Sequence, residues 1–328
     1  TLHISEQADH LAVSWEYATD LFTHDHMASF AKQFAHLLAQ LVRQPSDALQ
    51  TLSWLSDEEY ASYWQQAQGE SCVLPETCLH ELFEQQVVVN PRTAAVVFNE
   101  QSYSYELLNQ QANQWVFFLD QLGVSPGDLL VICLPPGPES ILLMVACLKA
   151  GIIYSPVDYQ TPEGRLSDLL QQCQARVLIS SADVLLPDFA GQIVNPFKVQ
   201  SEVLCQPVHN PLRKIAASDT ALVIFTSGSS GQPKGVCCRH RSLVNLLDQF
   251  QQWQPLAPGD RGSVWTSLSF DVSVYEIFSV LTRGATLYPV AAEKRPLGQE
   301  FFDFLQREKI SSAYIPPFWL ADFERWLL

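Results

Sequence analysis

The sequence predicts an α/β protein made of stacked α/β lobes with largely parallel sheets, plus a small α+β segment at the N-terminus. From His80 onward, strand-like apolar runs alternate with helix-like stripes, which is the pattern of a parallel sheet covered by helices. Pro126-Gly127-Asp128 and Pro258-Gly259-Asp260 each lead into a strand, a helix and a second strand. This repeated pattern indicates repeated βαβ units in two lobes.

Length and composition predict about two globular domains. The chain has 328 residues, of which 47% are hydrophobic and 16% are charged, so it can bury a large core. Its longest apolar run, 141–148, is far shorter than the roughly 20 residues that cross a bilayer. The formal net charge of −16 argues against nonspecific binding to nucleic acid or to anionic membranes. We therefore expect neither as a partner.

The cysteines indicate a reducing compartment. The eight cysteines include no C-x-x-C pair and no zinc-type spacing to histidine, and Cys133 and Cys147 lie inside apolar runs. We expect reduced, buried thiols in a cytoplasmic protein, and we assign no metal ligand.

The N-terminal segment predicts one strand and one helix. Alternation over residues 11–17 is typical of a half-buried strand. An apolar stripe at helical spacing, which starts after the candidate N-cap Asp25 and ends near Arg43, predicts the helix. One strand and one helix cannot close a core, so we expect the end of a larger domain. The stripe consists of Met27, Phe30, Phe34, Leu37 and Leu41.

Charge separates this segment from the rest. Residues 1–74 carry ten carboxylates against Lys32 and Arg43, about half of the net charge in under a quarter of the chain. We predict a first module over 1–64, a linker over 65–78, where polar and Pro-containing residues gather, and the α/β domain over 79–328. The chain begins with neither Met nor a signal peptide, so we expect a piece of a longer polypeptide.

Within the α/β domain, individual elements follow from periodicity. An apolar stripe predicts a helix over 104–122 that stops at Gly123. Residues 129–134 and 263–268 are predicted strands after the two Pro-Gly-Asp turns. The continuous apolar run that starts at Leu222 predicts a strand buried on both faces.

The loop after that last strand can bind an anion. Glycines allow backbone N–H groups to approach a ligand, hydroxyls donate, and one lysine supplies the charge. It is not a Walker A loop, because two residues separate its last glycine from the lysine. A flexible Ser/Gly connection is the alternative. The residues concerned are Thr226, Ser227, Gly228, Ser229, Ser230, Gly231 and Lys234.

These residues resemble a known family, the adenylate-forming enzymes, and specifically the adenylation domains of nonribosomal peptide synthetases. Residues 226–235 look like the family's phosphate-binding signature, Thr-Ser-Gly-(Ser/Thr)-(Ser/Thr)-Gly-x-Pro-Lys-Gly. Three further segments are similar to other family motifs: 103–113, 148–158 and 269–276. In the second of these, Ile152 and Ser155 replace the usual Gly and Val. The fold implied is an incomplete adenylate-forming core.

The resemblance implies that Asp271 binds the α-ammonium group of an amino acid substrate. We expect Asp271 at the end of a buried strand, where a carboxylate needs a partner. Taken alone, it could instead cap the helix that begins near Val272. By position in the motifs, Phe270, Val272, Tyr275 and Tyr314 line the substrate pocket, with Tyr275 where Trp is commonest. The alternative for the two tyrosines is ordinary aromatic packing.

The reaction implied is ATP-dependent activation of an α-amino acid. The substrate carboxylate attacks the α-phosphorus, pyrophosphate leaves, and the acyl-adenylate is captured by the phosphopantetheine thiol of a carrier domain. ATP and Mg²⁺ are the implied cofactors. The implied partners are the carrier domain, the rest of the condensation and adenylation domains, and a small adenylation-helper protein.

The N-terminal segment adds to the resemblance. Residues 21–22, the helix up to Arg43 and residues 52–59 resemble the C-terminal tail of a condensation domain. The condensation motif, His-His followed by Asp-Gly, is absent, and His24-Asp25-His26 lacks its spacing, so we assign these residues to capping and solvation.

Residues 310–319 resemble the pocket strand that precedes the family's Gly-Pro-Thr-Glu segment, which the 328 residues do not include. We expect the catalytic Lys beyond Leu328 and therefore expect this chain by itself to be inactive. Two alternatives stay open at this point: an acyl- or aryl-CoA synthetase of the same superfamily, and a noncatalytic docking piece.

Overall fold

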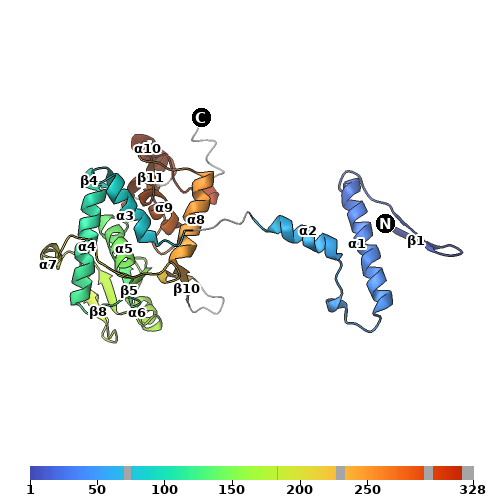
Figure 1. The fold of residues 1–328 in the computed structure, drawn as a ribbon, viewed down its shortest axis with the longest axis horizontal. Coiled ribbons are helices and arrows are strands. Elements are labelled where there is room, and N and C mark those ends of the chain that lie inside the picture. Colours follow the sequence, from blue (N-terminus) through green and yellow to red (C-terminus); the bar gives the residue numbers. More distant parts are fainter. Residues whose placement is uncertain (70–74, 183, 227–232, 292–297, 320–328) are drawn as a thin grey trace. The chain divides into compact units, whose positions relative to one another are not determined.

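The computed structural model describes residues 1–69, 75–182, 184–226, 233–291 and 298–319 (Figure 1). The chain divides into two compact units, Thr1–Val73 and Leu74–Leu328. The division falls inside the segment predicted as the linker. None of the helices in the described ranges combines the length and apolarity needed to cross a membrane.

The first unit is a hairpin followed by helices. Strands β1 (Leu2–Glu6) and β2 (Leu11–Trp15) pair antiparallel, and Trp15 packs edge-on against Phe30 and Phe34 of α1 (His24–Arg43). The strand β1 was missed by the prediction. Short η1 (Leu49–Thr51) and helix α2 (Asp57–Ala67) complete the unit. Helix α2 continues past residue 64, so the predicted linker begins inside a helix.

The cap of α1 differs from the prediction. The Thr23 hydroxyl accepts the N–H of His26 at 3.2 Å, and Asp25 lies inside the first turn. Thr23 is the N-cap because its backbone is extended, whereas Asp25 is already helical. None of the residues of α1 or α2 is buried, as expected of a unit that closes no core of its own.

The second unit contains a six-stranded sheet with the order β10-β9-β6-β5-β7-β8. All neighbours are parallel except β9 and β10, which form an antiparallel hairpin at the edge. The strands are β5 (Leu129–Cys133), β6 (Ile153–Pro156), β7 (Val177–Ser180), β8 (Gln192–Val194), β9 (Thr220–Thr226) and β10 (Lys234–Arg239). Residues Ala221 to Ile224 of β9 are buried, as its apolar run predicts.

A second sheet has four strands in the order β11-β12-β3-β4. Strands β11 (Arg261–Val264), β12 (Thr286–Pro289) and β3 (Ala94–Phe98) run parallel, and β4 (Gln101–Ser104) returns from β3 as a hairpin. The two predicted βαβ units are therefore confirmed, one in each sheet. Strand β11 ends at residue 264 and not at the predicted 268, because the next two N–H groups donate to the side chain of Glu276.

Helices cover both sheets, and α3, α4 and α5 pack on one another (Figure 1). Helix α4 lies close to its predicted range, with Ser104 as N-cap and Gly123 beyond its end at φ +77°. The second unit's helices are α3 (Leu79–Val89), α4 (Tyr105–Gln121), α5 (Pro138–Ala150), α6 (Glu163–Gln172), α7 (Gln200–Leu204), α8 (His240–Trp253), α9 (Val272–Leu281), α10 (Gln299–Arg307) and the short η3 (Pro317–Trp319).

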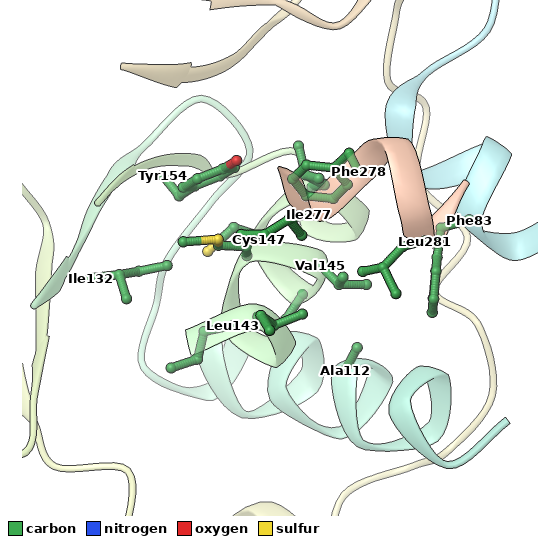
Figure 2. Close-up of a cluster of buried hydrophobic side chains, with 14 of the residues drawn as sticks. Phe83, Ala112, Ile132, Leu143, Val145, Cys147, Tyr154, Ile277, Phe278 and Leu281 are labelled. Carbon is green, nitrogen blue, oxygen red and sulfur yellow. The ribbon is translucent and has the colours of Figure 1, made fainter. Parts of the chain in front are cut away.

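One hydrophobic core joins the two sheets. Figure 2 shows Ile277, Phe278 and Leu281 of α9 lying over Val145 and Cys147 of α5. The same cluster contains buried residues from strands of both sheets. Burying one such aliphatic or aromatic side chain contributes about 1.5–3 kcal/mol, so this contact holds the two sheets in a fixed relation.

A buried polar network reinforces the helix layer. The Lys149 ammonium group, on α5, forms an ion pair with Glu84 of α3 and donates to Asn109 of α4 at 2.8 Å and to Asn210 at 3.2 Å. Burial lowers the pKa of Lys149, and the Glu84 carboxylate opposes that shift. Because every donor of this buried cation has a partner, the network fixes three helices together.

The cysteines partly depart from the prediction. Among the described residues, seven cysteines are free thiols; Cys78, Cys133 and Cys147 are buried, as predicted. Cys205 and Cys237 are exposed, so the expectation of buried thiols is correct for only some of the described cysteines. They lie just after the short helix α7 and on the edge strand β10, where little chain covers them.

Candidate functional site

A cavity of about 490 Å³ lies beside the carboxyl ends of the parallel neighbours β6 and β9. Its wall also includes helix α6 and the loop before α9. This edge of a parallel sheet is the usual place for ligands in α/β proteins. The lining residues are Pro156, Val157, Asp158, Thr161, Arg165, Leu169, Ile224, Phe225, Thr226, Ser269, Phe270 and Asp271.

The predicted anion-binding loop starts at this cavity. Thr226 ends β9 and lines the cavity, and Lys234 opens β10 directly opposite it in the hairpin register. The Thr226 hydroxyl donates to the carbonyl of Lys234 at 3.4 Å. The strand pairing and this hydrogen bond thus hold the two ends of the loop next to each other. The residues between them, Ser227, Gly228, Ser229, Ser230 and Gly231, lie outside the described residues.

Asp271 lies in the same cavity but in a different setting from the one predicted. It ends the loop 265–271, is exposed, and caps α9 through Oδ1, which accepts the N–H of Val272 at 2.9 Å. The prediction of a carboxylate at the end of a buried strand is therefore wrong, because β11 stops at Val264. Oδ2 has no partner among the described residues, so one carboxylate oxygen is free for a ligand.

Hydrogen bonds to side chains of α9 hold loop 265–271 in place. The Glu276 carboxylate, which is 3% exposed, accepts the N–H of Trp265 on Oε1 and the N–H of Thr266 on Oε2, each at 3.2 Å. The Ser273 hydroxyl donates to the carbonyl of Phe270 at 2.6 Å. These bonds satisfy backbone groups that the end of β11 would otherwise leave unpaired.

A further hydrogen bond ties the loop to the six-stranded sheet. Asp158, just after β6, accepts the Ser267 hydroxyl on Oδ2 at 2.8 Å and the N–H of Gln160 on Oδ1 at 2.9 Å. The Ser267 and Ser269 hydroxyls are 3.1 Å apart. Asp158 therefore positions the loop that carries Asp271 against the strand edge that carries Thr226.

The other predicted pocket residues divide into two groups. Phe270 lines the cavity and is 61% exposed. Val272, Tyr275 and Tyr314 do not line it. Tyr275 packs its ring 4.3 Å from that of Phe250 on α8, and burial raises its pKa.

The hydroxyl of Tyr275 donates to Gln254 Oε1 at 3.0 Å, at the end of α8. Tyr314 is half-buried and follows Ser312, which bridges to Gly262 of β11. These contacts fit the alternative of aromatic packing as well as the predicted role. The contribution of Tyr275 and Tyr314 to a side-chain pocket therefore stays a prediction.

Sequence reasoning missed Arg165, Asp158 and Glu276. Asp158 follows the mostly apolar segment 152–157, and a carboxylate at the end of a strand is a signal that could have identified it. Glu276 is a single acid in an apolar helix, which also indicates a buried role. Arg165 gives no such signal, since only the fold brings α6 to the cavity.

A second group of ionisable side chains lies between α3 and α8. Ligand atoms of Cys78, His80 and His240 lie within 4.8 Å of one another. His240 Nδ1 accepts the N–H of Leu79 at 3.2 Å, and the Cys78 thiol donates to the carbonyl of Ile215 at 3.4 Å. Because two of the three groups are engaged, we interpret this cluster as a structural link between the two helices.

The chain matches the model of the AMP-binding enzyme family over residues 83–325. It therefore belongs to this family. The predicted fold class is confirmed by a solved nonribosomal peptide synthetase, FmoA3 in its AMPPNP-bound form, which matches with a TM-score of 0.81 and 23% identity. That match covers 94% of this chain and 33% of the solved chain.

Curated relatives are also peptide synthetases. The chain is 34% identical over 322 residues to CymA of Salinispora arenicola, a probable non-canonical nonribosomal peptide synthetase, and 30% identical over 322 residues to gramicidin S synthase 2 of Brevibacillus brevis. The matches cover 98% and 96% of this chain. They span only 4% and 7% of those two relatives' own lengths.

Proposed function

We propose that this chain is part of a nonribosomal peptide synthetase module that activates an α-amino acid with ATP, giving aminoacyl-AMP and pyrophosphate. The observation that carries the proposal is that Thr226 and Asp271, from two motifs far apart in the sequence, line one cavity. The first belongs to a loop suited to phosphate, and the second offers a free carboxylate oxygen suited to an ammonium group.

Catalysis by such a site consists of positioning and charge stabilisation. The ammonium group of Lys234 would bind phosphate oxygens, and the hydroxyl of Thr226 would turn from the carbonyl of Lys234 to donate to them. Asp271 Oδ2 would pair with the substrate ammonium group. The substrate carboxylate is then held for in-line attack on the α-phosphorus. A ligand without phosphate groups or without an ammonium group would lose one of these two sets of contacts.

In this proposal Mg²⁺ is bound by the phosphates of ATP and not by side chains of this chain. Mg²⁺ prefers oxygen ligands and is usually bound with substrate phosphates. Both oxygens of Asp158 already accept hydrogen bonds, and the free oxygen of Asp271 is assigned to the ammonium group. We therefore assign no Mg²⁺ ligand in this chain, and Mg²⁺ would enter as the ATP complex.

The proposed partners are other domains of the same module and a helper protein. The aminoacyl group would pass to the phosphopantetheine thiol of a carrier domain, and a small helper protein would be a further partner. Residues 1–64, within the first unit, would be the tail of a condensation domain. The exposed apolar side chains of its hairpin and helix, such as Leu11, Leu38 and Val42, are consistent with a surface that more of that domain covers.

ATP–pyrophosphate exchange tests the proposal, measured in the longer polypeptide of which we propose this chain is a part. We expect exchange that depends on one or a few α-amino acids and not on benzoate or fatty acids. Exchange with aryl or fatty acids alone would contradict the substrate class, and no exchange with any acid would contradict the activity. The 328-residue chain by itself should show no exchange, because the resemblance assigns the catalytic Lys to residues beyond it.

A further inference from the structure

The candidate cavity contains one basic side chain among its described lining residues, that of Arg165. Arg165 lies in the first turn of α6 and is exposed. Its guanidinium group makes no hydrogen bond or ion pair with any residue in the described ranges. An arginine that faces a cavity without a partner is available to an anionic ligand.

The acidic residues of the cavity do not neutralise this cation. The two carboxylate oxygens of Asp158 accept the N–H of Gln160 and the hydroxyl of Ser267. Asp271 uses Oδ1 for the cap of α9. In a chain with a formal net charge of −16, an anion needs such a local cation to enter at all.

The helix that carries Arg165 is fixed to both sides of the predicted phosphate loop. Leu169 of α6 packs in the same hydrophobic cluster as Phe225, which precedes Thr226. At the far end of α6, Gln172 Nε2 donates to the carbonyl of Pro233 at 2.7 Å, next to Lys234. The position of Arg165 relative to the ends of the loop is thus set by packing.

We propose that Arg165 binds a phosphate oxyanion in this cavity, in addition to Thr226 and Lys234, the two described ends of the predicted phosphate loop. The planar guanidinium group matches two oxygens of one phosphate. The ligand is either the polyphosphate of ATP or the phosphodiester of a phosphopantetheine arm, which share this chemistry. The inference rests on the proposed function.

The test compares Arg165→Gln and Arg165→Lys in the longer polypeptide, with Arg241→Gln as the control. Arg241 is also exposed but lies on α8 and does not line the cavity. The measurements are KM for ATP and for the amino acid in pyrophosphate exchange, and KM for the phosphopantetheine-bearing carrier in aminoacyl loading.

Arg165→Gln should raise KM for a phosphate-bearing ligand on the order of 10-fold, a modest loss for a charge-assisted bond because the site is exposed. A rise in the KM for ATP identifies the polyphosphate, and a rise in the KM for the carrier identifies the phosphodiester. Arg165→Lys should raise KM less than Arg165→Gln does, because lysine keeps the positive charge, and Arg241→Gln should match the wild type. The difference in KM between Arg165→Gln and the wild type should shrink at high salt.

Unchanged KM values for both ligands in Arg165→Gln would overturn the inference, and so would a rise confined to the amino acid. Because Arg165 is exposed, its variants should keep the wild-type unfolding midpoint, and Arg165→Lys changes volume least. Failure of the proposed function is recognised separately: the wild-type polypeptide would then show no amino-acid-dependent exchange.

Discussion

Replacing Asp271 by Asn separates its two roles, because the amide keeps the capping oxygen and deletes the charge. Oδ1 accepts the N–H of Val272 at 2.9 Å, and an Asn side chain can accept it equally. The free energy of unfolding should therefore change by less than about 1 kcal/mol. At Oδ2 the variant would present an NH₂ donor to the substrate ammonium group, which is repulsive.

The size of the catalytic loss follows from the exposure of Asp271. A fully desolvated ion pair would cost more, but this carboxylate is exposed before substrate binds, so we assign it one charge-assisted hydrogen bond of about 1.5–3 kcal/mol. In the longer polypeptide, kcat/KM for the amino acid in pyrophosphate exchange should fall roughly 10- to 150-fold.

The matched α-hydroxy acid is the control substrate. It has the same side chain and no ammonium group, so Asp271→Asn should lose far less activity with it, and the preference for the amino acid should narrow. Equal losses with the amino and hydroxy acids would refute the assignment of Asp271 to the ammonium group. Urea unfolding of the variant checks that the cap survives.

The phosphate loop, the buried Glu276 and the paired histidines each give a further prediction. Lys234→Ala in the longer polypeptide should raise KM for ATP about 10-fold or more while folding persists, and unchanged exchange kinetics would reduce the loop to a connection. Glu276→Gln leaves one acceptor oxygen where the buried carboxylate offers two to the half-buried N–H groups of Trp265 and Thr266. It should therefore lower the free energy of unfolding by about 1–3 kcal/mol and raise KM for the amino acid more than KM for ATP. An unaltered urea midpoint would contradict this. Burial lowers the pKa values of His80 and His240 from 6.5 to about 4, so their contribution to stability is present above pH 6.5 and is lost as the pH falls toward 4. Urea unfolding should show a loss of up to about 1.4 kcal/mol per pH unit for each histidine, and a flat profile over that window would be the contrary result.

The sequence predicted those parts of the fold that depend on local pattern. Helix α4 and the two βαβ units have strong periodicity and clear Gly or Pro-Gly-Asp punctuation, and the structure has them close to the predicted bounds. The end of β11 was placed four residues too late, because the pattern does not show that Glu276, eleven residues from Trp265, takes over the backbone N–H groups. Tertiary hydrogen bonds of this kind override strand propensity.

The site residues also divide into those that a local motif identifies and those that only the tertiary structure brings together. Thr226 and Asp271 were found from their motifs, since each motif is contiguous in the sequence. The roles of Arg165 and Asp158 depend on α6 and β6 reaching the same strand edge, which is a property of the sheet order β9-β6-β5. The exposure of Asp271 likewise depends on where β11 stops, so its assumed burial could not be corrected from sequence alone.

A structure of the longer polypeptide bound to a non-hydrolysable aminoacyl-adenylate analogue tests the central claim most directly. The claim predicts the ligand ammonium group about 3 Å from Asp271 Oδ2, and the phosphate mimic at the cavity beside Thr226. An analogue bound elsewhere, with Asp271 still engaged only in capping α9, would contradict it.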